Sequence, residues 1–244
     1  YAESRGKSIL ITANGVNKFV DFQMRGVWND WVLKNGRLDC SANLLYVWRS
    51  SIERGHELLG RYVPLVLFHD WGFGFPWKDL NFTDKVNWLR VYVAEIYAAG
   101  GYFAFPVSDM GSTQTAKDDG TTTWISYLAQ FYLNHSYLYH NRTWLSPTDV
   151  QILGGSQAQG LYGGVSVAFW QQTGRSRLIV HLINHHFQDH ILTPQRGLII
   201  NMSSDERPLR VYAISPSFKG EEELEYDMKG HSIQINVPEL DDYV

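Results

Sequence analysis

The stretch VPLVLFHDWG at residues 63–72 decides the fold class of this chain. Its first six residues are apolar without a break, which is typical of a parallel strand that is buried on both faces. Pro64 is compatible with this, because a proline is tolerated at the start of a strand. His69 and Asp70 then follow at the point where the strand ends.

A helix and a further strand are predicted directly after this stretch. Apolar residues recur at helical spacing over residues 86–97, Thr83 or Asp84 can cap the start, and a Gly-Gly pair can end the helix. Residues 102–107 (YFAFPV) are again a continuous apolar run. A strand, a helix and a strand in this order are typical of a parallel sheet.

Two earlier strands and two more helices complete this part of the chain. We expect the strands at residues 7–13 and 38–48, and the helices at residues 49–60 and 122–140. The four strand-plus-helix units predict an α/β domain with a parallel sheet over residues 1–148.

The pattern changes after Pro147. Short alternating runs separated by turn residues predict an antiparallel β-sandwich over residues 149–244, which the chain enters through the glycine-rich residues 154–164. The expected strands lie at residues 165–170, 178–184, 197–202, 209–214, 222–226 and 232–237.

The composition argues against several classes of protein. The 244 residues are 44% hydrophobic and carry a net charge of −4 without a basic run, so nucleic acid is not expected as a partner. The single Cys40 rules out a disulfide scaffold and leaves the compartment open, although an extracellular or periplasmic location is favoured. No apolar run is long enough to span a bilayer, so no membrane partner is expected. Nine tryptophans are typical of surfaces that stack sugar rings, or equally of an aromatic core.

Motifs of other enzyme classes are absent from the sequence. It has no G-x-S-x-G elbow, no G-x-x-x-x-G-K-S/T loop, no CxxC and no H-E-x-x-H, so no cofactor is expected. His181, His185, His186 and His190 lie on a predicted strand and turn without the spacing of metal ligands. We therefore expect no metal site, and a metal-dependent hydrolase is kept as a third hypothesis.

Polar residues follow the ends of three predicted parallel strands. The loops after such strands converge at one edge of the sheet, and ligands bind there. Two facing carboxylates are the minimum for cleaving a glycosidic bond, one as the acid and one as the nucleophile or base. Asp70 and Asp109 are the predicted catalytic pair. The predicted substrate-binding residues are Asn14, Asn17, His69, Trp71 and Trp77.

The aspartates, the histidine and the tryptophans of this set also have a purely structural interpretation. An aspartate at the end of a strand often caps a turn or a helix. His69 can be a hydrogen-bonded core residue. Trp71 and Trp77 can pack their loop onto the sheet.

Several segments in this order resemble a known architecture. They are LVLFHDWG (65–72), AAGGYFAF (98–105), the aromatic helix over 127–139, and RLIVHLINH (177–185). The chain resembles the second half of a (β/α)8-barrel glycoside hydrolase followed by a C-terminal β-sandwich. The last segment is similar to strands in the accessory sandwiches of dextranase-like and β-galactosidase-like enzymes.

The resemblance implies a partial (β/α)8 barrel that cleaves poly- or oligosaccharides at its mouth, or a part of such an enzyme. The chain departs from this pattern at the second predicted strand, where Trp48, Arg49, Ser50 and Ser51 precede Glu53 and no glutamate ends the strand. The alternative is a non-catalytic carbohydrate-binding or structural protein with the same fold. Four parallel strands cannot close a barrel, so we expect another chain or a second copy to complete it.

Overall fold

The computed structural model describes most of the chain. It covers residues 12–14, 20–27, 32–34, 37–39, 44–60, 64–69, 81–104, 120–140, 142–155, 163–189 and 191–244. For residues 13–14, 25–27, 32–34, 37–39 and 67–69 it describes the backbone alone. Most of the strand predicted at residues 7–13 lies outside this part.

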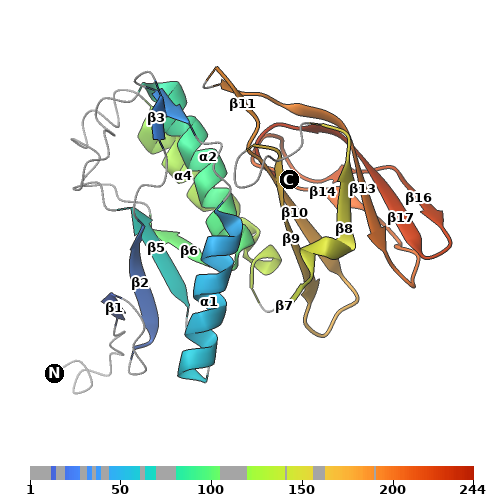
Figure 1. Ribbon diagram of the computed structural model, residues 1–244, viewed down its shortest axis with the longest axis horizontal. Coiled ribbons are helices and arrows are strands. Elements are labelled where there is room, and N and C mark those ends of the chain that lie inside the picture. Colours follow the sequence, from blue (N-terminus) through green and yellow to red (C-terminus); the bar gives the residue numbers. More distant parts are fainter. Residues whose placement is uncertain are drawn as a thin grey trace.

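The N-terminal part contains a four-stranded parallel sheet (Figure 1). Its elements are β1 (Thr12–Asn14), β2 (Phe22–Val27), α1 (Leu45–Leu59), β5 (Leu65–His69), α2 (Phe82–Ala98) and β6 (Tyr102–Ala104). The strands lie in the order β1-β2-β5-β6, and every pairing is parallel. The predicted parallel α/β part is confirmed, and the described strands form no closed barrel.

The second strand of this sheet is not where the sequence predicts it. The strand expected at residues 38–48 is wrong, because α1 begins at Leu45. Of the residues described before this helix, those of β4 (Arg37–Asp39) are extended. β4 pairs antiparallel with β3 (Val32–Lys34) as a hairpin. β2 takes the second place in the parallel sheet instead.

The burial pattern of α1 explains this error. Leu45, Trp48 and Ile52 are buried, whereas Tyr46 and Val47 are 45% and 47% exposed. The buried side chains therefore recur three and four residues apart, as on one face of a helix. A short apolar run alone does not distinguish this period from that of a buried strand.

The helices predicted downstream are present. The prediction at residues 49–60 falls within α1 and its C-terminal Gly60. The helix predicted at residues 122–140 is α4 (Thr121–Asn134), which a short 3₁₀ turn follows at Ser136–Leu138.

The cap of α2 differs from the prediction. Asn81 caps the helix, because its Oδ1 accepts a hydrogen bond from the Asp84 N–H at 2.9 Å. Thr83 and Asp84 are therefore wrong as caps. The helix ends before Gly100, whose φ of 88° lies in the left-handed region that favours glycine.

The C-terminal part is built from antiparallel sheets, and its described residues contain no helix after residue 165. One sheet, here called the middle sheet, has the order β10-β9-β7, and a second, the outer sheet, has the order β16-β17-β13-β8. The middle sheet consists of β7 (Arg142–Leu145), β9 (Val165–Gln172) and β10 (Leu178–Asn184). The outer sheet consists of β8 (Val150–Leu153), β13 (Gln195–Ser203), β16 (Tyr226–Lys229) and β17 (Ser232–Leu240). Short pairs are formed by β11 (Phe187–Gln188) with β12 (Ile191–Leu192), and by β14 (Tyr212–Ala213) with β15 (Glu222–Glu223).

The domain boundary near residue 148 stays a prediction. β7 precedes that residue and pairs with β9, so the middle sheet draws strands from both sides of it. β7 and β8 were not expected from the sequence.

Two apolar cores lie on opposite faces of the middle sheet. Ile179 and Ile183 of β10 pack in the core that contains α2 and α4, whereas Leu182 packs in the core of the outer sheet. The Trp170 indole N–H donates to the Ala98 carbonyl at the end of α2 at 3.0 Å. The helices thus lie between the parallel sheet and the antiparallel sheets (Figure 1).

Candidate functional site

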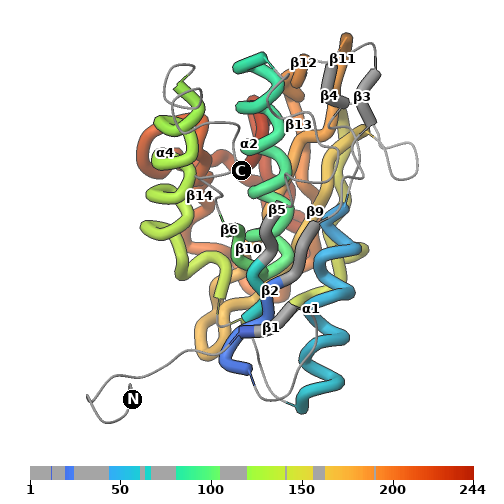
Figure 2. The backbone as a smooth tube through the Cα atoms, turned by 90° about the vertical axis from the view of Figure 1, so that its left-hand side faces the viewer, coloured from blue at the N-terminus to red at the C-terminus, as the bar shows by residue number. Residues whose placement is uncertain are grey.

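The parallel strands all run in one direction, so their C-terminal ends point to the same edge of the sheet, here called the carboxyl edge. β1, β2, β5 and β6 end at Asn14, Val27, His69 and Ala104. Because α2 leads from the end of β5 to the start of the parallel β6, it runs back along the sheet. α2 and α4 therefore begin on the side of the carboxyl edge, and they lie side by side (Figure 2). In sheets of this type, ligands bind at that edge.

The structure places the backbones of two predicted site residues at the carboxyl edge. Asn14 is the last residue of β1 and His69 the last of β5, with β2 between these strands. Strands two places apart are roughly 10 Å apart. Asn14 pairs with Met24 and His69 with Val27, so the two backbones are also offset by three residues along the strands, which is about 10 Å. The other predicted residues lie outside the described part: Asn17, Asp70, Trp71, Trp77 and Asp109.

Two buried charged residues lie in the first turn of α2, near the carboxyl edge. Asp84 is 2% exposed and Lys85 is 3% exposed. The Asn81 side-chain amide donates to Asp84 Oδ2 at 3.0 Å. The sequence indicated Asp84 only as a possible cap, and it held no signal that Lys85 would be buried, because a lysine near a helix start is normally solvated.

A pocket of about 470 Å³ lies between α2, α4 and the C-terminal end of the chain. We call it the α2–α4 pocket. Its lining residues are Arg90, Thr123, Trp124, Tyr127, Pro216, Ser217 and Asp241. The Arg90 guanidinium lies 5.8 Å from the centroid of the Trp124 ring, and the Trp124 and Tyr127 rings meet edge to face.

The charge at the α2–α4 pocket is held by ion pairs. Arg90 Nε donates to the buried Asp242 carboxylate at 2.7 Å, and its Nη2 pairs with Asp241. Burial acts to lower the pKa of the Arg90 guanidinium, but Asp242 and then Asp241 outweigh it, so the pKa is raised. The Asp241 side chain remains 35% exposed. Aromatic rings next to charged hydrogen-bonding groups suit a polar ring such as a sugar.

His181 of β10 and His185, which follows this strand, belong to the core. His181 Nδ1 lies 2.7 Å from the Tyr243 hydroxyl, which lies 2.8 Å from the Tyr139 hydroxyl, and all three side chains are buried. Burial and then the nearby Arg142 lower the pKa of His181 to about 3, so its ring is neutral. His185 Nε2 lies 3.2 Å from a carboxylate oxygen of the buried Glu95.

Nothing in the described part of the chain gathers three or more His, Cys, Asp or Glu side chains in a metal-binding arrangement. His190 lies outside that part. Comparison with known proteins finds no protein-family model and no curated protein that matches the chain. Among the described helices, none has the length and apolar character needed to cross a membrane.

Proposed function

We propose that this protein binds a carbohydrate at the carboxyl edge of its parallel sheet and cleaves a glycosidic bond there. One observation carries the proposal. β1, β2, β5 and β6 are neighbours in chain order with no reversed strand, so their loops leave the same edge. Asn14 and His69 end two of these strands, and Asp70 follows His69 directly in the sequence.

The spacing of β5 and β6 suits a catalytic pair of carboxylates. Asp70 comes directly after β5, and Asp109 comes shortly after β6. These two strands are neighbours, and neighbouring strands lie about 4.8 Å apart. Glycosidases place their two carboxyl groups roughly 5 to 10 Å apart. Side chains from the loops after adjacent strands can meet this spacing, with Asp70 as the acid and Asp109 as the nucleophile or base.

We further propose that the four parallel strands are half of a (β/α)8 barrel that a second copy or another chain completes. Light scattering tests this part. A complex larger than 28.1 kDa is expected, and a stable monomer without exposed apolar surface would contradict it.

A second candidate function is carbohydrate binding without turnover. The α2–α4 pocket favours it, because Trp124 and Tyr127 offer aromatic faces independently of Asp70 and Asp109. Incubation with a panel of labelled glycans separates the two functions, since a binding protein retains the glycan intact.

Replacement of Asp70 tests catalysis directly. Asp70→Asn keeps the shape of the side chain but removes its ionisable proton, so turnover should fall by a factor of at least about 100 if Asp70 is the general acid. The melting temperature should stay the same. Release of reducing ends and thermal melting are measured on the same variant.

The control for this experiment is Asp205→Asn. The Asp205 side chain is 94% exposed and lies in the C-terminal part, so neither turnover nor melting should change. If Asp70→Asn lowers the melting temperature but leaves turnover intact, Asp70 is a capping residue and the catalytic assignment fails.

A further inference from the structure

Among the residues that the structure describes, no strand pairs with the outer edge of the first half of β10, here called the free edge of the middle sheet. β10 is the end strand of that sheet and pairs antiparallel with β9. The Gln172 N–H donates to the Arg177 carbonyl at 2.9 Å, which sets the alternation of hydrogen bonds along the pair. Every second residue from Arg177 onward bonds to β9. The peptide groups of Leu178 and Val180 therefore point away from β9, towards the free edge.

The second half of the same edge is already covered by an antiparallel ladder. The Val244 N–H donates to the Leu182 carbonyl at 3.0 Å, and the Leu182 N–H donates to the Val244 carbonyl at 2.7 Å. The Asn184 N–H donates to the Asp242 carbonyl at 2.7 Å. This ladder runs towards Leu178, so it defines the direction and position of a strand on the open half.

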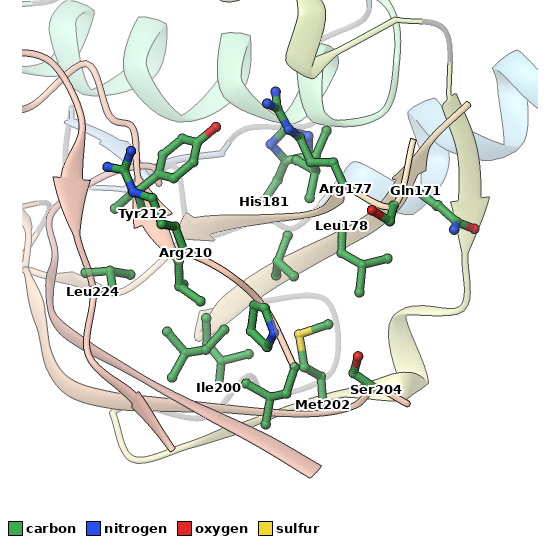
Figure 3. A pocket seen from close by; sticks show the side chains of 18 of the residues that line it. Gln171, Arg177, Leu178, His181, Ile200, Met202, Ser204, Arg210, Tyr212 and Leu224 are labelled. Carbon is green, nitrogen blue, oxygen red and sulfur yellow. The ribbon is translucent and has the colours of Figure 1, made fainter. Parts of the chain in front are cut away.

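A large groove lies beside the open half of β10. Its volume is about 1270 Å³, and it separates β10 from the outer sheet. Figure 3 shows Leu178 on one side and Ile200 and Met202 of β13 on the other. Leu178 is 37% exposed and Leu209, which also lines the groove, is 99% exposed. Two sheets of a sandwich normally fill such a space with interdigitating apolar side chains.

The rim of the groove is positively charged. Four arginines line it against two acidic residues: Arg175, Arg177, Arg207, Arg210, Asp205 and Glu206. Arg175 and Arg177 come just before β10. A strand antiparallel to β10 therefore has its C-terminal end beside these two arginines.

We propose that the groove binds an extended peptide strand that adds to the edge of β10, in line with residues 242–244. The peptide groups of Leu178 and Val180 supply the hydrogen bonds, as in other cases of strand addition. Directly opposed residues of an antiparallel pair point to the same face, so every second side chain of the peptide enters the groove and is apolar. The arginines favour acidic residues at its C-terminal end.

A synthetic peptide tests this proposal on the whole chain. The probe is fluorescein-labelled Thr-Val-Thr-Val-Thr-Val-Glu-Glu, and the control peptide has Ser in place of each Val. The first should bind in fluorescence anisotropy, and the control should bind at least about tenfold more weakly. In the complex, the Leu178 and Val180 amides should exchange hydrogen at least about tenfold more slowly.

Val180→Pro is the decisive variant. Of the backbone hydrogen-bonding groups it removes only the outward N–H, which β9 does not use, and it keeps an apolar side chain against the core of the outer sheet. Proline is tolerated on that side of an edge strand. Peptide affinity should fall at least about tenfold while the circular dichroism spectrum is unchanged. Leu178→Asp is the second variant, for the case that the proline disturbs folding. It should weaken peptide binding because it places a charge on the apolar wall of the groove. Leu133→Asp, on the exposed face of α4, is the control and should bind like the native chain.

Three results of the peptide-binding experiments would overturn the proposal. They are absence of binding to the native chain, equal binding of both peptides, and full binding by Val180→Pro and Leu178→Asp. A dimer that protects the Leu178 and Val180 amides without peptide would assign the edge to a second copy and also overturn it.

Discussion

His181 is an ionisable group that the fold keeps neutral. It lies between the rings of Tyr139 and Tyr243, with 2.7 Å from its Nδ1 to the Tyr243 hydroxyl. Its pKa is about 3 in the folded chain against about 6.5 in the unfolded chain. The unfolded chain therefore binds the extra proton between these values. The stability that depends on a neutral His181 is complete above about pH 6.5 and is lost as the pH falls towards 3.

We expect the free energy of unfolding to fall by about 2 kcal/mol through His181 alone between pH 7 and pH 5, given its pKa of about 3. Burial and then Arg142 lower the pKa of His140 to about 4, which adds to the loss with the same sign. Urea unfolding across this range measures the slope. His181→Gln should flatten it, whereas His231→Gln, at an exposed site, should leave it unchanged. Equal slopes in His181→Gln and the native chain would contradict the assignment.

At the scale of the residue, the sequence predicted where along the chain the candidate site residues lie, but not which charged side chains are buried near them. The residues at strand ends could be chosen from the apolar runs, because a buried strand must end where polar residues begin. The burial of Lys85 and the ion pairs of Arg90 could not, because their partners are brought together only by the packing of α2.

Helix α2 is the element that joins both parts of the chain, and its start depends on Asn81. The Asn81 side chain accepts from the Asp84 N–H and donates to the Asp84 carboxylate. Asn81→Ala should lower the free energy of unfolding by about 1 kcal/mol, as for other lost caps. Thr83→Ala is the matched control, because Thr83 lies within the helix and does not cap it. A larger effect of Thr83→Ala than of Asn81→Ala would place the cap at Thr83.

Elements were predictable where their pattern was clear. β10 is a nearly continuous apolar run between turn residues, and in α2 apolar residues recur at helical spacing up to the Gly-Gly pair. β2 was not predicted, because Gln23 and Arg25 interrupt its apolar pattern. Its pairing between two parallel neighbours is decided by contacts with residues distant in sequence. β7 and β8 are only four residues each, too short for a periodic signal.

At the scale of the molecule, Arg90 ties α2 to the C-terminal end. Its partner Asp242 is fully buried. Arg90→Met should therefore leave the buried Asp242 carboxylate without its cationic partner, with hydrogen bonds from Ser217 and the Tyr243 N–H, and lower the free energy of unfolding by about 3 kcal/mol. Arg196→Met is the control, since the Arg196–Glu239 pair is 77% and 48% exposed and should cost less than about 1 kcal/mol. Equal losses in the two variants, measured by urea unfolding, would show that the buried pair contributes no more than a surface pair.

The sequence predicted the order of a parallel part and an antiparallel part, and the structure confirms it. It did not predict that α2 and α4 cover one face of the middle sheet. Strand alternation implies that one face is buried, but a helix partner distant in sequence leaves no local signal.

The middle sheet has a consequence for how the sequence can change over time. In β9, every residue before Gln171 is buried or half-buried, because cores lie on both faces of the strand. In a strand with one solvent-exposed face, about half of the residues can be substituted with little loss of stability. β9 has no such exposed face over these residues. Substitutions along the whole of β9 should therefore destabilise the protein and be removed by selection. Substitutions on the solvent-exposed face of the outer sheet should be tolerated more often.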